Sequence, residues 1–234
     1  MLRSSPASRS SIGVSVLAVG VLGAPLAAWG GTFTQPSGLA VGSSYRLVFV
    51  TSNVYDATAT TISTYNTDVT GDAAANAALP ATTWAAIAST ATTDASTNAA
   101  CAIAGCANDP LFMVNGAEVA ATLADFFAGT TSITVTEAGN AYTGGYVWTG
   151  SNADGTAATG NELGATYPEV GAPTAAGSGN GLTVGITDQN IILQSLYAIS
   201  APIVVTATPE PASAPLLAVG AALLAALGLR RRSV

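Results

Sequence analysis

The chain has 234 residues with 6 basic and 13 acidic side chains, so its formal net charge is −7, and only 8% of its residues are charged, against about 25% in ordinary globular domains. Histidine and lysine are both absent, which excludes Ser-His-Asp and Cys-His nucleophile systems, imidazole metal sites, P-loop lysines and lysine Schiff bases. Because nucleic-acid affinity depends on Lys and Arg at phosphates, we expect no nucleic acid among the partners.

Residues 1–30 have the pattern of a secretory signal peptide. Arg3 and Arg9 lie in a Ser-rich start without acids, and residues 12–28 are apolar or small throughout. A positive start, an apolar stretch and small residues before a cleavage site are typical of export signals. We expect cleavage after Gly30 or two residues earlier. The alternative is a permanent membrane anchor, for which the apolar run is slightly short.

Residues 31–206 form the expected exported domain, and they are strongly acidic. Twelve of the 13 acidic residues lie here, all but Glu210, together with a single base, Arg46, which gives a net charge of −11. A chain segment of this length suits one domain. Its surface repels anions and remains soluble through like charge, so it would bind an acidic polysaccharide only through bridging cations.

The first half of this domain predicts a strand, a helix and a second strand. Residues 45–51 (YRLVFVT) alternate in polarity and are rich in β-branched and aromatic side chains, which favours a strand. Residues 58–79 carry apolar side chains at three- and four-residue spacing, which predicts a helix, with a break at Gly71. Residues 83–89 (TWAAIAS) predict a short strand with Trp84 buried.

The next segment predicts a hairpin followed by a short helix. Residues 111–119 (LFMVNGAEV) contain two apolar runs separated by Asn115-Gly116, a dipeptide typical of two-residue hairpin turns. Residues 121–128 predict a helix with three apolar side chains facing inward: Leu123, Phe126 and Phe127.

The last part of the domain predicts strands on either side of a long loop. Residues 132–137 and 146–149 have strand-like composition, as do residues 195–200 (SLYAIS) and 203–206. Between them, residues 152–185 are rich in Gly, Ala, Pro and Thr, which is typical of loops.

This order of elements resembles the C-type-lectin-like fold in its endostatin-like branch, an α+β fold. The resemblance rests on the LVFVT strand, the helix, the LFMVNGAEV hairpin, the VWTG strand and the final SLYAIS strand. It implies that the first and last strands pair, with a loop-rich half between Trp148 and the last strand. The E-P-N and W-N-D tripeptides of sugar-binding lectins are absent, and so is the cysteine expected beside Tyr197, so the resemblance implies no sugar binding. The alternative fold is a β-sandwich.

Cys101 and Cys106 are the two cysteines of the chain. In an exported protein such a pair predicts a disulfide, with free thiols as the alternative. The closed loop is short, so the bond would add only about 2 kcal/mol of stability. Two thiolates without histidine are too few for zinc, and we expect neither a metal nor a cofactor.

No residue pattern in the domain predicts catalysis. Glycoside hydrolysis needs two carboxylates about 5–10 Å apart, and the sequence singles out no pair among the six candidates Asp94, Asp109, Glu118, Asp125, Asp154 and Glu162. Residues 151–156 lack the alternating acids of a calcium loop and predict a turn with Gly155 at positive φ. Residues 177–181 predict a loop and not a phosphate-binding motif. Five aromatic side chains could stack on sugars: Trp84, Tyr142, Tyr146, Trp148 and Tyr167. At strand spacing such side chains are more often in the core, and only Tyr142, Trp148 and Tyr167 are candidates for exposure.

Residues 207–234 form a three-part tail. It begins with Pro209-Glu210-Pro211, continues with the uncharged stretch 212–229, and ends with Arg230, Arg231 and Arg232 before the last two residues. Eighteen helical residues span about 27 Å, enough for a thin hydrocarbon layer, and the arginines favour a cytoplasmic end. The two prolines keep the preceding peptide extended and non-helical above the outer face of the membrane.

This tail resembles the PEP-CTERM sorting signal of Gram-negative bacteria in its tripeptide, span and basic cluster. The resemblance implies an exosortase partner, a transient stay in the inner membrane, cleavage near the tripeptide, and release to the cell surface or the exopolysaccharide matrix. The alternative is a plain tail anchor. We therefore expect a non-catalytic structural or adhesive protein of the exopolysaccharide or biofilm layer, with a carbohydrate- or cation-binding module of the same location as the alternative.

Overall fold

Two strands from opposite ends of the domain form the centre of a sheet. The structure is a computed structural model, and it describes residues 33–100, 108–173 and 180–206. Within it, β1 (Ser44–Val50) pairs antiparallel with β7 (Ser195–Ser200), with Val48 opposite Ile199. Nearly all residues of both strands are buried, as expected for strands covered on both faces. The strands predicted at residues 45–51 and 195–200 are confirmed.

The described residues form an eight-stranded curled sheet of mixed direction. Its main order is β4-β3-β1-β7-β5-β6, while β2 pairs with β7 and β8 pairs with β1. The pairs β1–β3 and β5–β7 are parallel. The remaining strands are β2 (Trp84–Ala86), β3 (Leu111–Met113), β4 (Glu118–Ala120), β5 (Val147–Trp148), β6 (Val170–Gly171) and β8 (Ile203–Val204).

The longest helix, α1 (Ile62–Ala75), packs against β2 and β7 with its apolar face. Tyr65, Val69 and Ala73 lie on that face at four-residue spacing and are buried, as the periodicity of a helix requires. The helix continues through Gly71, so the predicted break is wrong. Packing of the apolar face offsets the roughly 1 kcal/mol by which glycine weakens a helix.

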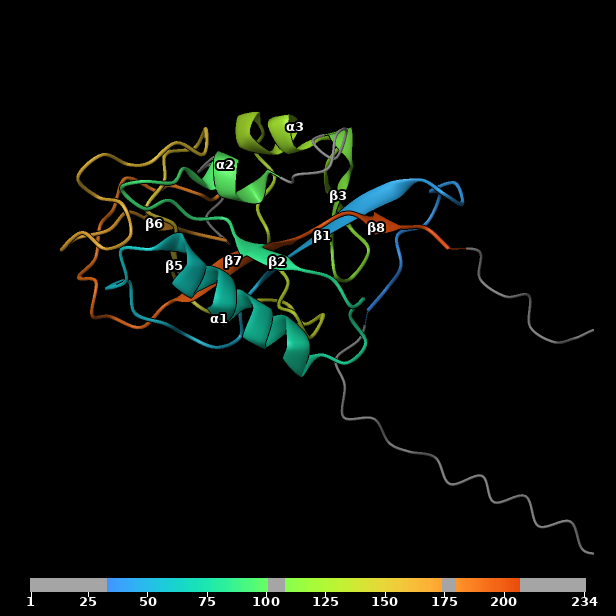
Figure 1. The fold of residues 1–234 in the computed structure, drawn as a ribbon, viewed down its shortest axis with the longest axis horizontal. Coiled ribbons are helices and arrows are strands. Elements are labelled where there is room, and N and C mark those ends of the chain that lie inside the picture. Colours follow the sequence, from blue (N-terminus) through green and yellow to red (C-terminus); the bar gives the residue numbers. More distant parts are fainter. Residues whose placement is uncertain (1–32, 101–107, 174–179, 207–234) are drawn as a thin grey trace, which may run out of the picture.

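The domain has two short helices, α2 (Ala95–Ala99) and α3 (Leu123–Ala128). The side chains of Asn98 in α2 and Asn66 in α1 are hydrogen-bonded, whereas α3 follows β4 and lies away from α1 (Figure 1). At the start of α3, the Thr122 hydroxyl accepts a hydrogen bond from the Asp125 backbone N–H at 3.0 Å and donates to the Asp125 carboxylate at 2.8 Å, which caps the helix. The prediction of a helix here is confirmed, whereas α2 was not predicted.

The large aromatic side chains form the core between α1 and the loop-rich half. Phe49 and Trp84 stack at a ring-centroid distance of 4.9 Å, and Trp148 is fully buried. The Trp148 indole Nε1 donates to the backbone oxygen of Tyr55 at 3.0 Å, so the core ring is also hydrogen-bonded, as buried Trp usually is.

Several loop predictions are confirmed and one strand prediction is wrong. Gly116 and Gly155 have φ of 87° and 79° and lie in the expected turns. Residues 132–137 form only isolated bridges, including Val50 with Thr136, because the chain turns back at Gly139 (φ 80°). Strand β6 lies inside the predicted loop 152–185.

The loops after β5 gather at one end of the sheet, and the first and last described residues lie at the other end (Figure 1). At that other end, the backbone N–H of Gly42 donates a hydrogen bond to the backbone oxygen of Val205 at 2.9 Å. No helix among the described residues has the length and apolar character needed to cross a membrane. The predicted signal peptide 1–30, the tail 207–234 and Cys101–Cys106 lie outside the described residues.

Candidate ligand-binding cleft

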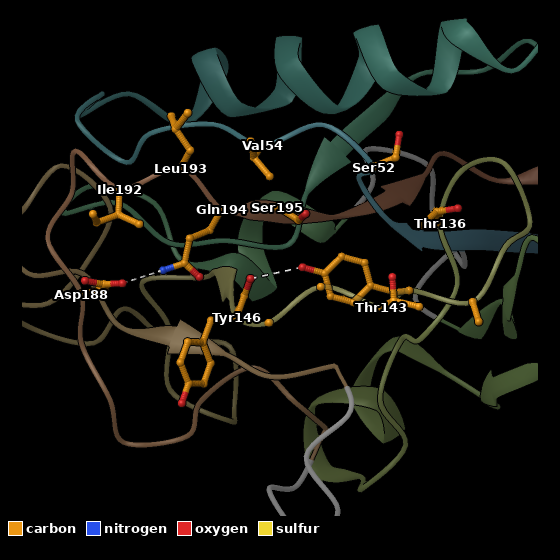
Figure 2. A pocket seen from close by; sticks show the side chains of 14 residues that line it. Ser52, Val54, Thr136, Thr143, Tyr146, Asp188, Ile192, Leu193, Gln194 and Ser195 are labelled. Carbon is orange, nitrogen blue, oxygen red and sulfur yellow. Dashed lines mark hydrogen bonds between the residues drawn. The ribbon is translucent and has the colours of Figure 1, made fainter.

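A cleft of about 520 Å³ opens where β1 ends and β7 begins (Figure 2). Pockets that bind small molecules have volumes of about 300–1,000 Å³, so this one is large enough for a ligand. Its walls come from three parts of the chain that are distant in sequence: Ser52 and Val54 after β1, Thr136 with residues 141–146 before β5, and Asp188 with residues 192–195 leading into β7.

Two contacts hold the walls together. Tyr55 and Gln194 form an antiparallel bridge with backbone hydrogen bonds of 2.8 and 3.0 Å. The buried Glu137 carboxylate accepts hydrogen bonds from the backbone N–H of Ser52, at 2.9 Å, and from its hydroxyl. Hydrogen bonds to a charged group are stronger than neutral ones, so the Ser52 wall is fixed to the segment that carries Thr136.

Tyr142 and Tyr146 form the aromatic part of the lining. The Tyr142 hydroxyl donates to the backbone oxygen of Tyr146 at 3.3 Å, and Gly144 lies against the hydroxyl end of the Tyr142 ring. Tyr146 remains 42% exposed. A glycine at residue 144 is required because a Cβ atom there would collide with the Tyr142 ring.

Gln194 presents a fixed amide to the cleft. Its Nε2 donates to the Asp188 carboxylate at 3.1 Å, and that carboxylate also accepts from the backbone N–H of Gln189 at 2.8 Å. A carboxylate can only accept hydrogen bonds when ionised, so the amide nitrogen must face Asp188. The Gln194 Oε1 atom is therefore left facing the open space of the cleft (Figure 2).

Three polar side chains of the lining have a free hydrogen-bonding atom. Gln194, Ser195 and Thr136 are only 7%, 2% and 8% exposed, and within the described part of the chain the amide oxygen and both hydroxyls form no hydrogen bond. None of the three atoms is among the fully enclosed side-chain atoms without a partner. They border the cleft, so they are open to water or to a ligand inside it.

The rim of the cleft is apolar and uncharged apart from Asp188. Val54, Ile192 and Leu193 are exposed on it, Leu193 by 61%, although apolar side chains of this size are usually buried. The one basic residue of the sequence between residues 31 and 206, Arg46, is buried elsewhere, and its Nε donates to the Ser200 backbone oxygen at 2.7 Å. The cleft therefore offers no positive charge to an anionic ligand.

A second polar cluster lies at α1, outside the cleft. The Asp72 carboxylate accepts hydrogen bonds from the Tyr55 hydroxyl, at 2.9 Å, and from the Asn53 amide. Burial raises the pKa of Tyr55 above its usual range, and the bond to Asp72 adds to this effect. Burial, with the neighbouring carboxylates of Asp72 and Asp56, also raises the pKa of Asp68. No group of three metal-ligating side chains occurs among the residues that the structure covers. The hydrogen bonds of the cluster join the segment after β1 to α1.

The six candidate carboxylates of the sequence do not line the cleft. Most of them accept hydrogen bonds within the fold instead: Asp94 accepts from the distant Ala157 N–H at 2.7 Å, and Asp154 from the nearby Thr156 N–H at 3.0 Å. Asp125 caps α3, Glu162 accepts from the Gly160 N–H at 2.6 Å, and Asp109 accepts from the Ser44 hydroxyl. Glu118 is exposed on β4.

Only one of the three aromatic candidates for exposure lies in the cleft, namely Tyr142. Tyr167 is exposed outside it, and Trp148, the third candidate, is fully buried. Tyr146 was expected in the core but is exposed at the cleft. Its position next to Gly144-Gly145 was the available signal, because glycines leave neighbouring rings uncovered.

No family model matches the chain, and no curated protein matches it either. The chemistry of the cleft and of the two chain ends is therefore the basis for assigning a function.

Proposed function

We propose that the chain is an exported surface protein, sorted by an exosortase, with a non-catalytic structural or adhesive role in the exopolysaccharide layer. The observation that carries this proposal is the order of features in residues 207–234: Pro209-Glu210-Pro211, then an uncharged stretch, then Arg230, Arg231 and Arg232. Each of these features alone is weak support for a sorting signal. Together with an N-terminal export pattern, they support export followed by sorting to the cell surface.

The route follows from the physical properties of the tail. The stretch 212–229 holds the protein in the inner membrane, and the three arginines keep its end on the cytoplasmic side. The two prolines present the preceding peptide in an extended form that a protease can read. Cleavage there releases the acidic domain, which like charge keeps soluble outside the cell.

The fold proposed for this domain is the C-type-lectin-like fold. The antiparallel pairing of β1 with β7 supports it, since this pairing brings the two ends of the domain together. The loop-rich region between Trp148 and β7 supports it as well. A β-sandwich consists of two packed antiparallel sheets, whereas β1–β3 and β5–β7 are parallel, so the sandwich is the less suitable description.

The lack of histidine and lysine and the local roles of the candidate carboxylates favour a non-catalytic role. Of the alternative binding roles, the cleft favours carbohydrate over a cation. Its lining includes a single carboxylate, Asp188, whereas calcium takes six to eight oxygen ligands.

The test is to replace Pro209, Glu210 and Pro211 together with alanine in the full chain and to follow the protein by cell fractionation. We expect the variant to stay in the inner membrane while the unchanged chain reaches the surface without its last residues. The matched control replaces Thr206 and Thr208, just upstream, with alanine. Unchanged release of the triple variant, or surface protein that retains residues 212–234 by mass spectrometry, would overturn the proposal.

A further inference from the structure

We infer that the cleft between β1 and β7 binds a neutral saccharide without calcium. This inference rests on the proposed function, because release to the exopolysaccharide layer is what would bring the cleft into contact with such a ligand. It adds the class of ligand and the residues that contact it.

The first support is a set of polar atoms at the cleft that have no internal partner among the described residues. The Gln194 amide oxygen is an acceptor, and the hydroxyls of Ser195 and Thr136 can donate or accept. All three border the cleft, and none is among the fully enclosed atoms without a partner, so water reaches them. A ligand rich in hydroxyl groups would replace that water and pair with all three.

The second support is the combination of these polar atoms with apolar and aromatic side chains. Tyr142 and Tyr146 line one side of the cleft, while Ile192 and Leu193 lie at its rim. A sugar ring has apolar C–H faces and polar edges, and tyrosine presents an apolar body with a polar tip. A purely apolar ligand would leave Gln194 unpaired, and a purely polar one would leave the rim exposed.

The third support is charge. Asp188 is the only charged side chain of the lining, and the net charge of the exported domain is −11. Uronate and sulfate groups would be repelled, because no cation in the cleft offsets their charge. Asp188 is itself bonded to Gln194 and Gln189, so it positions the amide. The ligand is therefore neutral. One carboxylate supplies too few oxygen ligands for calcium, so we expect binding without it.

The test uses the full chain in detergent micelles, with EDTA present, and measures retardation by polysaccharides in affinity electrophoresis. The neutral probes are dextran, galactomannan and soluble cellulose, and the anionic probe is polygalacturonate. We expect retardation by at least one neutral probe and none by polygalacturonate. Failure of all three neutral probes, binding only to polygalacturonate, or binding only after calcium is added would overturn the inference.

Two variants connect the binding to the cleft. Ser195→Ala removes a hydroxyl that has no internal partner, so the fold should be unaffected while the dissociation constant rises about fivefold. Gly144→Ala pushes the Tyr142 ring from its place and should also weaken binding. Gly71→Ala is the matched control, since Gly71 lies in α1 outside the cleft and a Cβ there meets nothing within 4 Å. Binding that neither Ser195→Ala nor Gly144→Ala changes would place the saccharide elsewhere and overturn the inference.

The outcome is separable from that of the sorting test. A chain that is released normally but binds no neutral polysaccharide retains its proposed sorting and loses this ligand. If the chain binds the polysaccharide through Ser195 but is not released, saccharide binding stands and the proposed sorting fails.

Discussion

The Nε atom of Arg46 donates a hydrogen bond to the backbone oxygen of Ser200 at 2.7 Å, which links β1 to the end of β7. Arg46 is buried, and burial lowers its pKa to about 10 even though the Asp109 carboxylate opposes this effect. The Nη1 atom of Arg46 and the Oδ2 atom of Asp109 are both buried without a hydrogen-bond partner. The Asp109 carboxylate, which also accepts from the Ser44 hydroxyl, therefore offsets part of the cost of burying the guanidinium charge.

Removing either charge alone should destabilise the domain strongly. We expect Arg46→Met and Asp109→Asn each to lower the free energy of unfolding by about 3 kcal/mol, because each leaves the other group buried and uncompensated. The double variant should lose at least about 1 kcal/mol less than the sum of the two. Urea denaturation of the four proteins measures this coupling, and strict additivity would contradict it.

Stability should fall as the pH rises above 10. Burial raises the pKa values of Tyr45, Tyr55, Tyr65 and Tyr197 above the usual 10.0. The unfolded chain then loses tyrosine protons before the folded chain does, so the stability present below pH 10 is lost as the pH increases. Arg46, whose pKa is lowered, acts in the opposite direction but is a single group.

The measurement is the urea midpoint between about pH 8 and pH 11, together with tyrosinate absorbance of the folded protein. Tyr65→Phe should make the alkaline loss less steep. Tyr167→Phe is the control, because Tyr167 is half exposed, and it should leave the loss unchanged. A urea midpoint that stays constant up to pH 11 would show that folding does not raise the pKa values of these tyrosines.

Two glycines with positive φ should differ sharply in their tolerance of alanine. Gly150 has φ 56°, and a Cβ there would meet the backbone N of Leu163 and lie 2.6 Å from the Ser89 oxygen. Gly160 has φ 85°, but nothing lies within 4 Å of its Cβ position. Gly160→Ala should cost about 1 kcal/mol from backbone strain alone, and Gly150→Ala about 3 kcal/mol or more. Equal thermal shifts would show that the close approach at Gly150 is absent.

The sequence predicted those elements whose patterns are local. The alternation in residues 45–51, the spacing in α1 and the Asn115-Gly116 turn each depend on neighbouring residues, and all three are confirmed. Residues 132–137 have strand-like composition, but their partners are decided by the turn at Gly139. A strand signal does not say how many of its residues will be paired.

The cleft was not predictable in the same way. It combines Thr136, Gln194 and Ser52 from parts of the chain that the β1–β7 pairing and the bridge between Val50 and Thr136 bring together. Nothing local distinguishes these residues from other Thr, Gln and Ser side chains in a Thr-rich sequence. Trp148 shows the converse: from the sequence it is a candidate for exposure, but its side chain is fully buried and its Nε1 atom donates to the backbone oxygen of Tyr55.

The buried Glu169 should control the order of one loop next to the cleft without affecting the central sheet. Its carboxylate accepts hydrogen bonds from the Gly185 N–H at 2.8 Å, the Val184 N–H at 3.3 Å and the Thr183 hydroxyl. Gln in its place keeps the shape but loses the charge, which makes hydrogen bonds to backbone N–H groups about half as strong. We expect Glu169→Gln to lower the free energy of unfolding by about 1–2 kcal/mol.

Hydrogen exchange followed by mass spectrometry tests where this loss occurs. Residues 183–187 should exchange faster in Glu169→Gln, while β1 and β7 keep their protection, because local opening can occur below the global free energy of unfolding. Glu118→Gln is the matched control, since Glu118 is exposed on β4, and it should change neither exchange nor stability. Faster exchange spread evenly over β1 and the loop would mean that Glu169 supports the whole fold. Saccharide binding should weaken only if the loop also shifts Asp188, which lies directly beyond it.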